Sequence, residues 1–318
     1  MLIVPALAQA AFLGFDVSFQ QAYKAQQTYW EQIASLKPSS TSEERHLWSA
    51  EIGDLREWNG ERVFQNVQGR VQVLRNKKFE KSFEVPRDVM EDDQYGMYSG
   101  KAESLARAAK RWPDKLVTDA LIAGSSTATS FDGQYFFDTD HPQDVDDPSS
   151  AVQSNLFTAR PMTPDNVAYI RSQMMSLVDD HGVPLEIRPN LLVVPPQLEY
   201  PARQIMNSQI IGLPVNSTGT TVGTSPGGAA GADNVLRGTM DVLVLPRLAA
   251  HPTEYYLMDT TRGVKPLIFQ QRTAPEFAWR NRPEDDNTFE RDVYQYGVRA
   301  RGAAGYGLWF LAAKGVTT

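Results

Sequence analysis

The sequence predicts an α+β fold, and three stretches of the chain carry that prediction. In residues 98–116 apolar side chains recur at spacings of three and four, which is the pattern of a long amphipathic helix. In residues 79–85 apolar and polar side chains alternate, as they do in a strand. Residues 191–194, LLVV, form a short apolar run that is typical of a buried strand.

The N-terminal region predicts an arm of short helices. Residues 6–33 carry aromatic side chains at mixed helical spacing, and Ser40 to Glu44 offer the caps of a further short helix. Such an arm buries little by itself, so its aromatic side chains need another surface to lie against.

The next region predicts a long hairpin. Residues 62–66 and 69–75 are strand candidates around a turn at Gln68-Gly69, and Lys77 and Lys78 lie at a further turn. In residues 79–85 one face is half apolar and the other is charged. A ribbon of this kind is unstable alone, so it either lies on a neighbouring surface or forms an ordinary sheet edge.

A long helix follows, and we expect it to bend. Its apolar stripe runs to about Ile122 and stops at Gly124. Pro113 lies inside the stripe. Because proline removes one backbone hydrogen bond and clashes with the carbonyl four residues earlier, a kink is expected at residues 109–112.

The remainder alternates between helices and strands. Thr163 is a good N-cap, with Pro164 at the first helical position, for a helix to about Asp180, and residues 197–207 predict a second helix. Residues 216–233 are rich in Gly, Ser and Thr and predict a mobile loop. Further strands are expected at residues 241–246, 254–258, 266–271, 288–300 and 305–313.

The composition is that of a globular protein and excludes several chemistries. The 318 residues are 42% hydrophobic and carry a net charge of -7, and this length predicts roughly two domains, or one core with large excursions. No Lys/Arg-rich block is present, so any contact with nucleic acid should be loose. Cysteine is absent, which excludes disulfides, thiolate metal sites and a cysteine nucleophile.

The first residues, MLIVPALAQAAFLGF, only superficially resemble a signal peptide. They lack a basic start, and Pro5 interrupts the apolar run. No stretch of the sequence reaches the roughly 18 apolar residues that a membrane span needs. We therefore expect a soluble cytoplasmic protein without a membrane partner.

One stretch suggests chemistry, namely FDGQYFFDTDHPQDVDDP at residues 131–148. On an extended backbone Asp138 and Asp140 point to the same side next to His141, and such ligands suit hard or borderline metals. The four histidines of the chain are scattered, however, without the ligand spacing of a zinc site. Asp132-Gly133 is a turn dipeptide, and aspartates in such places usually cap turns. We therefore interpret the stretch as a structural loop without a metal.

No other motif predicts catalysis. A Gly-x-Ser-x-Gly motif is absent, and no Walker A or dinucleotide glycine motif precedes a helix. The acidic residues 91–93 suit the N-terminus of the long helix. The sequence therefore predicts neither an enzyme nor a cofactor.

The order of these features resembles a tailed-phage major capsid protein, and more closely the Mu-like prophage major head subunit family of the gpT type. The local motifs are Trp-x-Gly at residues 58–60, FEKSFEVPRDVMEDDQYGMY at 79–98, Pro113-Asp114, and FDGQYFFDTDHP at 131–142. Phe131 stands where the family pattern has tyrosine. The resemblance is strong in the first half and weaker in the second, where VRARGAAGYGLWFLA (298–312) fits the closing strand.

The resemblance implies the HK-97-type capsid fold. Residues 1–55 would be the N-terminal arm and 56–92 the E-loop. Residues 93–189 and 281–301 would form the peripheral domain with the spine helix, and 190–280 and 302–318 the axial domain. The arm and the E-loop would find their missing surfaces on neighbouring subunits. Tyr135, Phe136 and Phe137 would anchor the loop at 131–142 against the peripheral domain.

The implied function is that of a major capsid protein, which catalyses nothing. Hexamers and pentamers would assemble in the bacterial cytoplasm into the icosahedral head of a virion. The partners would be the scaffold, protease and portal proteins of the head and enclosed double-stranded DNA, bound without sequence specificity. A bend at Pro113 would absorb subunit tilting during shell expansion, and Lys77 or Lys78 would be the candidates for an E-loop crosslink.

Two alternatives stay open from the sequence. The chain could be the shell protein of a non-viral nanocompartment, which uses the same fold. It could also be a metal-dependent hydrolase with Asp138, Asp140 and His141 as ligands, which would be a small oligomer that binds a divalent metal.

Overall fold

A computed structural model describes residues 4–49, 69–91, 97–127, 129–147, 149–212, 231–280 and 285–317. The chain forms two compact units. Unit 1 consists of Met1–Arg45, Val73–Asp119 and Ile268–Gly305, and unit 2 of His46–Gln72, Ala120–Leu267 and Tyr306–Thr318. The strand expected at 62–66, the Trp-x-Gly motif and most of the glycine-rich loop lie outside the described residues.

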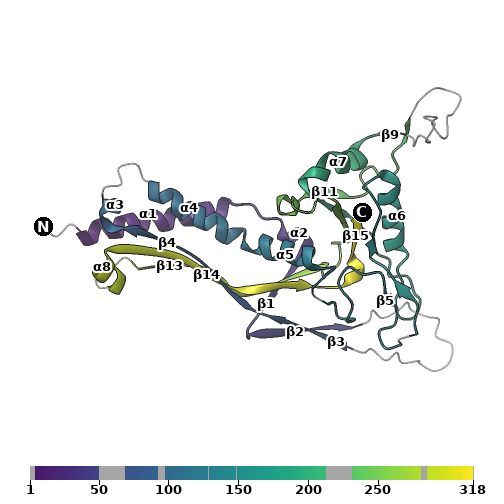
Figure 1. Cartoon of the computed structure of the whole chain (residues 1–318), viewed down its shortest axis with the longest axis horizontal. Coiled ribbons are helices and arrows are strands. Elements are labelled where there is room, and N and C mark those ends of the chain that lie inside the picture. Colours follow the sequence, from purple (N-terminus) through teal and green to yellow (C-terminus); the bar gives the residue numbers. More distant parts are fainter. Residues whose placement is uncertain are drawn as a thin grey trace. The chain divides into compact units, whose positions relative to one another are not determined.

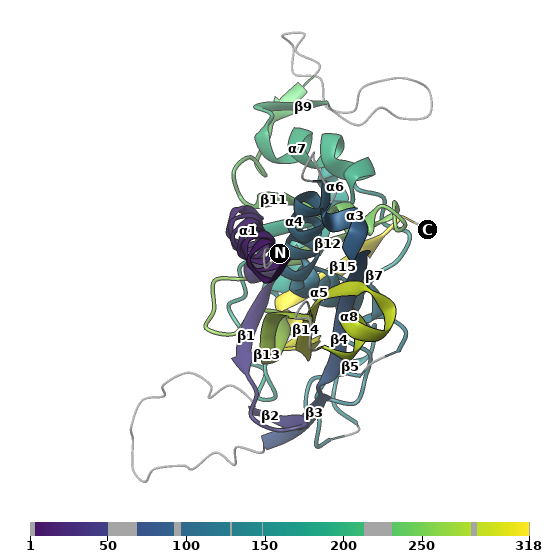
Figure 2. The ribbon, with the colours of Figure 1, turned by 90° about the vertical axis from the view of Figure 1, so that its left-hand side faces the viewer.

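Unit 1 is built on a four-stranded sheet with the order β1-β13-β14-β4. Its strands are β1 (Ala34–Pro38), β4 (Lys77–Pro86), β13 (Leu267–Arg280) and β14 (Val293–Tyr306). Its helices are α1 (Val4–Ala25), α2 (Trp30–Ile33), α3 (Arg87–Glu91), α4 (Met97–Lys110), α5 (Trp112–Ala123) and α8 (Asp286–Arg291). Figures 1 and 2 show α1 lying alongside α4.

The apolar residues of β4 pack as their alternation predicts. Phe83 stacks on Tyr296 of β14, and Val85 is fully buried. From the helices, Phe19 of α1 and Leu105 of α4 join the same apolar layer. A buried side chain of this size stabilises the fold by about 1.5–3 kcal/mol, so burial against the sheet holds the two helices in place.

The predicted kink in the long helix is a complete break. α4 ends at Lys110 and α5 starts at Trp112, so Pro113 lies in the first turn of α5. The N–H groups of the first turn have no acceptor within a helix, so the N–H that proline lacks costs no hydrogen bond there. The next residue, Asp114, is buried, and its Oδ1 accepts the backbone N–H groups of Tyr29 and Trp30, both at 3.0 Å. The expected single bent helix is thus two helices, and the break is tied to the start of α2.

The N-terminal arm differs from the prediction in two ways. α1 is one continuous helix of 22 residues rather than several short ones. Residues 40–44 do not start a helix, because Glu44 Oε1 accepts the N–H groups of Ser40 and Thr41 and closes a turn before β2 (Glu43–Ser49). These hydrogen bonds, that from Ser40 first, lower the pKa of Glu44 to about 2. Residues 40–44, which were predicted to cap a helix, therefore cap a turn.

The described part of the hairpin region shows a pairing that was not predicted. β3 (Gly69–Arg75) pairs with β2, and the Nε of Arg75 lies 3.0 Å from the Oε2 of Glu43. The expected partner strand at 62–66 lies outside the described residues, so its pairing with β3 stays a prediction. Lys77 and Lys78 do not lie at a hairpin turn. They begin β4, opposite Gly302 and Arg301 of β14.

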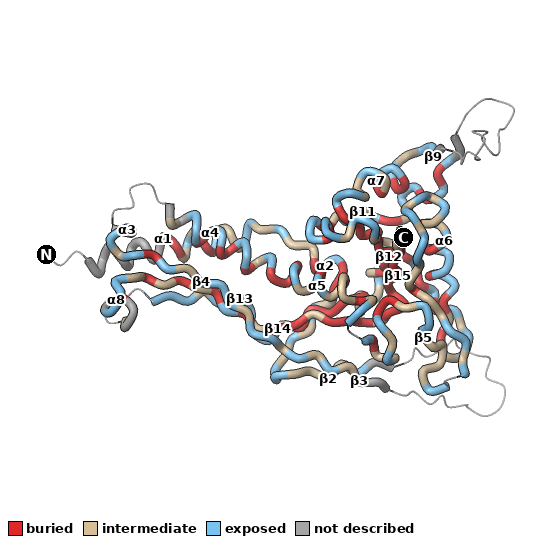
Figure 3. The backbone as a smooth tube through the Cα atoms, in the orientation of Figure 1, coloured by how far each residue is buried: buried red, intermediate tan, exposed pale blue. Residues whose placement is uncertain are grey.

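Unit 2 is built on a five-stranded sheet with the order β11-β8-β12-β15-β7. These strands are β7 (Leu156–Phe157), β8 (Leu191–Val194), β11 (Asp241–Val244), β12 (Glu254–Met258) and β15 (Ala312–Val316). β8 is buried along its whole length, as its uninterrupted apolar run predicts. The neighbouring strand β12 is buried except at its first residue (Figure 3). Two small ribbons add β5 (His141–Pro142) with β6 (Val152–Gln153), and β9 (Ile210–Gly212) with β10 (Gly231–Asp233).

The described part of unit 2 also contains helical segments, and they correct some of the expected bounds. They are α6 (Pro164–Met175), α7 (Glu199–Asn207) and the short 3-10 helices η1 (Pro196–Leu198), η2 (Pro246–Leu248) and η3 (Trp309–Leu311). Thr163 caps α6 as predicted, accepting from the N–H of Asn166. α6 ends at Met175, short of Asp180, because Asp179 Oδ1 accepts the N–H groups of residues 181 and 183 and closes a turn. None of the helices in the described part of the chain is long and apolar enough to cross a bilayer.

Three expected strands have other limits. The strand expected at 266–271 continues as β13 to Arg280, and that expected at 288–300 is replaced by α8 and then β14. Asp292, with φ +53°, separates these two elements. The apolar ending at 305–313 is interrupted by η3 before β15 begins.

A buried ion pair joins two neighbouring strands of unit 2. The Nζ of Lys314 on β15 lies 3.0 Å from the Oε1 of Glu254 on β12, and the hydroxyl of Tyr256 donates to the Oε2 of Glu254 at 2.6 Å. Burial raises the pKa of Glu254, but the hydrogen bonds from Tyr256 and Lys314 outweigh it and bring that pKa below its usual value.

Acid is therefore expected to weaken unit 2 through Glu254. A carboxyl whose pKa is lower in the folded protein contributes stability above its unfolded pKa, about 4.3, and loses it as the pH falls through the folded value. Lys314→Met should lower the free energy of unfolding near pH 7 by about 2 kcal/mol and flatten its decline on the acid side. Urea unfolding at several pH values measures both effects. Lys24→Met, at an exposed position, is the control. If the free energy of unfolding of Lys314→Met declined with falling pH as steeply as that of the wild type, the prediction would be contradicted.

Candidate functional site

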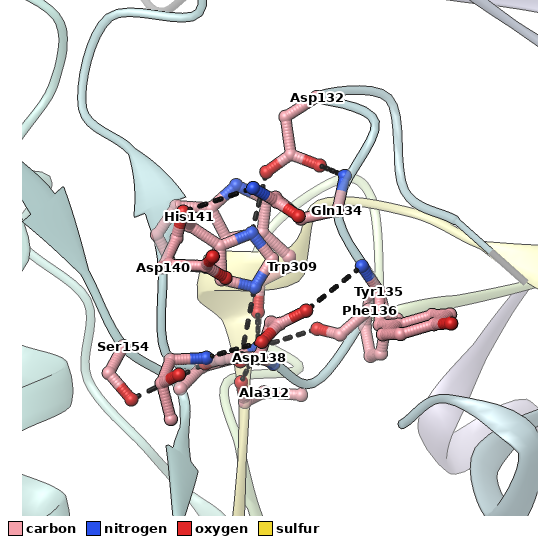
Figure 4. A network of polar contacts seen from close by, with 12 residues as sticks. Asp132, Gln134, Tyr135, Phe136, Asp138, Asp140, His141, Ser154, Trp309 and Ala312 are labelled. Atoms are coloured by element: carbon pink, nitrogen blue, oxygen red, sulfur yellow. Dashed lines mark hydrogen bonds and ion pairs between the residues drawn. The ribbon is translucent and has the colours of Figure 1, made fainter. Parts of the chain in front are cut away.

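The stretch that suggested chemistry lies in unit 2, on the segment that leads into β5 (Figure 4). Its turn forms where the sequence predicts it. Gly133 has φ +89°, a conformation that glycine adopts without strain. The Oδ1 of Asp132 accepts the N–H of Gln134 at 3.2 Å, and the carbonyl of Ser130 accepts the N–H of Gly133.

His141 is fully buried, and both of its ring nitrogens face oxygen atoms. The Nδ1 lies 2.5 Å from the Oδ2 of Asp132, and the Nε2 lies 3.2 Å from the Oδ1 of Asn155. The imidazole also stacks on the indole of Trp309, with ring centroids 3.9 Å apart. Both positions at which an imidazole could bind a metal are therefore taken up by hydrogen bonds within the protein.

Asn155 is the centre of this cluster, and it has no exposed surface. Its Oδ1 accepts the backbone N–H of Asp138 at 2.9 Å. Its amide nitrogen donates to three main-chain carbonyl oxygens at 2.8 to 3.1 Å, those of Phe136, Trp309 and Ala312. Because the amide nitrogen faces only acceptors, the side chain has one orientation, and the Oδ1 is the atom that faces His141.

Asp138 and Asp140 do come together, as expected for alternate residues of an extended segment. Desolvation of the carboxyl group, followed by the hydrogen bond and charge of Asp138, raises the pKa of Asp140, although the residue is exposed. Asp138 also holds the turn, because its carboxylate accepts the N–H groups of Tyr135 at 3.3 Å and Thr139 at 2.8 Å. Farther along, Asp147 accepts from the N–H and the hydroxyl of Ser149. The aspartates therefore act as caps, as the structural interpretation predicts.

The geometry does not assemble a metal centre from the three candidate ligands. The nitrogens of His141 point to Asp132 and Asn155 rather than to Asp138 and Asp140. Within the part of the chain that the structure describes, no three His, Cys, Asp or Glu side chains are grouped so that they could hold a metal ion. The arrangement can fasten a loop, because the side chains of Asp138 and His141 are engaged in hydrogen bonds within the protein.

Two of the three aromatic residues anchor the stretch, but their partners lie in the ranges 190–280 and 302–318, which the resemblance assigns to the axial domain and not to the expected peripheral domain. Phe136 stacks on Tyr306 with ring centroids 4.6 Å apart, and Phe137 packs on Tyr256. Tyr135, which was expected to anchor as well, is 42% exposed.

Sequence reasoning missed the two residues that organise the cluster. Asn155 lies in an unremarkable polar segment, and Trp309 is more than a hundred residues away in the sequence. The only available signals were the rarity of histidine and the turn dipeptide, and neither identifies a partner. Pairing His141 with Asp132 required the turn itself, which brings two residues nine positions apart into contact.

Comparison with known proteins gives a consistent result along the whole chain. A family model described as the Mu-like prophage major head subunit gpT matches residues 8–160, 156–248 and 246–317. The Mu-like prophage FluMu major head subunit of Haemophilus influenzae is 28% identical over 310 residues, covering 98% of this chain and 73% of that protein. The major capsid protein of Escherichia phage Mu is 26% identical over 312 residues, covering 98% of this chain and 74% of that protein.

Solved structures agree with the sequence comparisons. The procapsid chain of bacteriophage JBD30 is 28% identical and matches with a TM-score of 0.58, covering 98% of this chain and 75% of its own length. A virus-like particle from Pyrococcus furiosus shares the fold at a TM-score of 0.51 with 9% identity.

Proposed function

The chain belongs to the Mu-like prophage major head subunit gpT family, and from this premise we propose how it builds a head. It is a major capsid protein with the HK-97-type fold, a component of the virion shell and not an enzyme. We propose that it assembles as hexamers and pentamers in the cytoplasm of a bacterial host. The single observation that carries the proposal is the match of the family model, which extends from residue 8 to residue 317.

The exposed apolar side chains of the β2–β3 ribbon support assembly through this segment. Leu47 on β2 is 69% exposed and Val71 on β3 is 52% exposed. A two-stranded ribbon with such a face is not stable by itself. In the proposal a neighbouring subunit covers these side chains.

The domain boundaries are part of the proposal. Residues 1–55 are the N-terminal arm, 56–92 the E-loop, 93–189 and 281–301 the peripheral domain, and 190–280 and 302–318 the axial domain. The two compact units support this division in part, since α4 and most of β14 belong to unit 1 and the buried strand β8 belongs to unit 2. They divide the chain differently at residues 120–189, which belong to unit 2, and at residues 268–280, which belong to unit 1.

The proposed partners are the scaffold, protease and portal proteins of a phage head and enclosed double-stranded DNA. Pro113 lies at the break between α4 and α5, where a change of angle between two helices would absorb subunit tilting. Crosslinking through Lys77 or Lys78 has less support, because both residues lie in a paired strand of the sheet.

Electron microscopy of the expressed full-length chain tests the proposal. We expect closed shells or capsomers for the wild type and for Leu47→Met with Val71→Ile, which keeps the ribbon apolar. Leu47→Glu with Val71→Glu should fold, because both positions are exposed, but should stay as small oligomers in size-exclusion chromatography. Assembly of the glutamate variant would contradict the proposed role of the ribbon. Shells that enclose a protein cargo instead of DNA would favour the nanocompartment alternative.

A further inference from the structure

The long helical layer of unit 1 has a basic outer side. α4 and α5 turn their apolar side toward the sheet, where Ala102, Leu105 and Ala106 are buried. Four basic residues of this layer are exposed, namely Lys101, Arg107, Arg111 and Lys115. Lys101 and Arg107 lie on α4, Arg111 lies at the break between the two helices, and Lys115 lies on α5. We call this set the basic stripe.

The acidic residues of the same helices neutralise the stripe only weakly. Glu103 lies 3.2 Å from the Nη1 of Arg107, and Asp119 lies 2.5 Å from the Nζ of Lys115. All four side chains of these two pairs are between 43% and 54% exposed, and such pairs contribute about 0–1 kcal/mol, so they open easily. The carboxylate of Asp114 is buried and bound to the start of α2.

The remaining two members of the stripe have no carboxylate partner among the described residues. Lys101 is exposed, and the Nε of Arg111 donates to the backbone carbonyl of Arg107, which holds its guanidinium along the helix surface. α1, which packs along α4, adds the exposed Lys24 and the half-buried Asp16. The stripe is therefore locally positive in a chain whose net charge is -7.

The side chains between the charges decide which class of partner the stripe fits. Between Lys101 and Lys115 the exposed uncharged residues are Ser104 and Ala108, and neither offers an apolar anchor. A protein interface needs such an anchor in its centre, where lysine is depleted. A row of exposed cations along two successive helices instead matches a linear polyanion, and duplex DNA carries one negative charge per about 1.7 Å of its axis.

We infer that the basic stripe contacts the phosphate backbone of the DNA inside the shell. This inference rests on the proposed function, which places DNA within the head. The contact carries no sequence information, because arginine and lysine on phosphates position DNA without reading its bases. Each subunit would contact at most four phosphates, so the contact of a single subunit with DNA is weak. Every subunit of the shell would make the same contact. The DNA is then held loosely against the protein although the chain as a whole is acidic.

The test compares two variants that remove the same charge from opposite faces of unit 1. The stripe variant is Lys101→Gln, Arg107→Gln, Arg111→Gln and Lys115→Gln, which keeps helix propensity because glutamine is a good helix former. The control variant removes four exposed basic residues from the sheet strands β4, β13 and β14, and it is Lys78→Gln, Arg272→Gln, Arg280→Gln and Arg299→Gln. Unassembled full-length protein is mixed with a fluorescent DNA duplex of random sequence. Anisotropy is then recorded from about 20 to about 200 mM NaCl, because phosphate contacts depend on salt.

In the stripe variant we expect the slope of log affinity against log salt to become shallower by about three to four units, at about 0.9 per lost phosphate contact. The control variant should keep the wild-type slope. Equal slopes in the stripe variant and the wild type would overturn the inference, and so would an equal loss in both variants. Normal DNA binding with failure to close shells would assign the stripe to a protein partner and would also overturn it. Electron microscopy of the wild type tests the proposed function separately, because the DNA measurement does not require shells.

Discussion

Replacing Asn155 with leucine should lower the free energy of unfolding of unit 2 by about 4 kcal/mol. Leucine has a similar size but leaves three buried carbonyl oxygens, the N–H of Asp138 and the Nε2 of His141 without their partner. Each unsatisfied buried group costs about 1–3 kcal/mol. Because the side chain is fully enclosed, water cannot readily take its place.

Urea unfolding followed by near-ultraviolet circular dichroism measures the effect, because Trp309 stacks on His141 within the same cluster. Asn166→Leu is the matched control. Its amide donates to one carbonyl, that of Pro161, so the loss there should stay below about 1 kcal/mol. A loss at Asn155 no larger than that at Asn166 would show that the cluster does not hold unit 2 together.

The parts of the fold that the sequence predicts are those decided by neighbouring residues. The alternation of β4, the apolar run of β8 and the cap at Thr163 each depend on side chains only a few positions apart. The errors have long-range causes. The strand β2 forms because β3 lies beside it, although the residues that precede it resemble a helix cap.

The candidate site divides in the same way. Asp138 and Asp140 were identified because they are only two positions apart in the sequence, and the capping role of Asp138 follows from local turn chemistry. Asn155 and Trp309 were missed because only the folded unit brings them to His141. The basic stripe was missed for a related reason, since its four members are separated by three to five other residues and form no block in the sequence.

The break between α4 and α5 shows how one residue can connect separate parts of the chain. Pro113 permits the break, but the break alone does not determine where the N-terminal arm lies. Asp114 determines it by binding the start of α2, and the hydroxyl of Tyr29 adds a contact of 3.0 Å with Thr118. Trp30 and Trp112, one from each side of this junction, both pack on Phe269 of β13. The arm, the helix break and the sheet therefore meet at one point within unit 1.

Asp114→Ala is expected to lower the free energy of unfolding of unit 1 by about 3 kcal/mol. One buried and one partly buried backbone N–H group lose their acceptor, and α2 loses its cap. Both bonds go to the Oδ1 atom. Asparagine keeps an oxygen at that position, so Asp114→Asn should lose only about 1 kcal/mol, the part due to charge assistance.

Hydrogen exchange of the amides of Tyr29 and Trp30 distinguishes this role from general destabilisation. In Asp114→Ala these two amides should exchange faster relative to the amides of β4, whereas in Asp114→Asn they should stay protected. Thr118→Ala, which removes the contact of Tyr29 with the neighbouring turn but leaves both amide bonds, is the matched control. If alanine and asparagine at position 114 have equal effects on exchange, the carboxylate does not hold the arm, and the apolar contacts of Trp30 with Phe269 must do so alone.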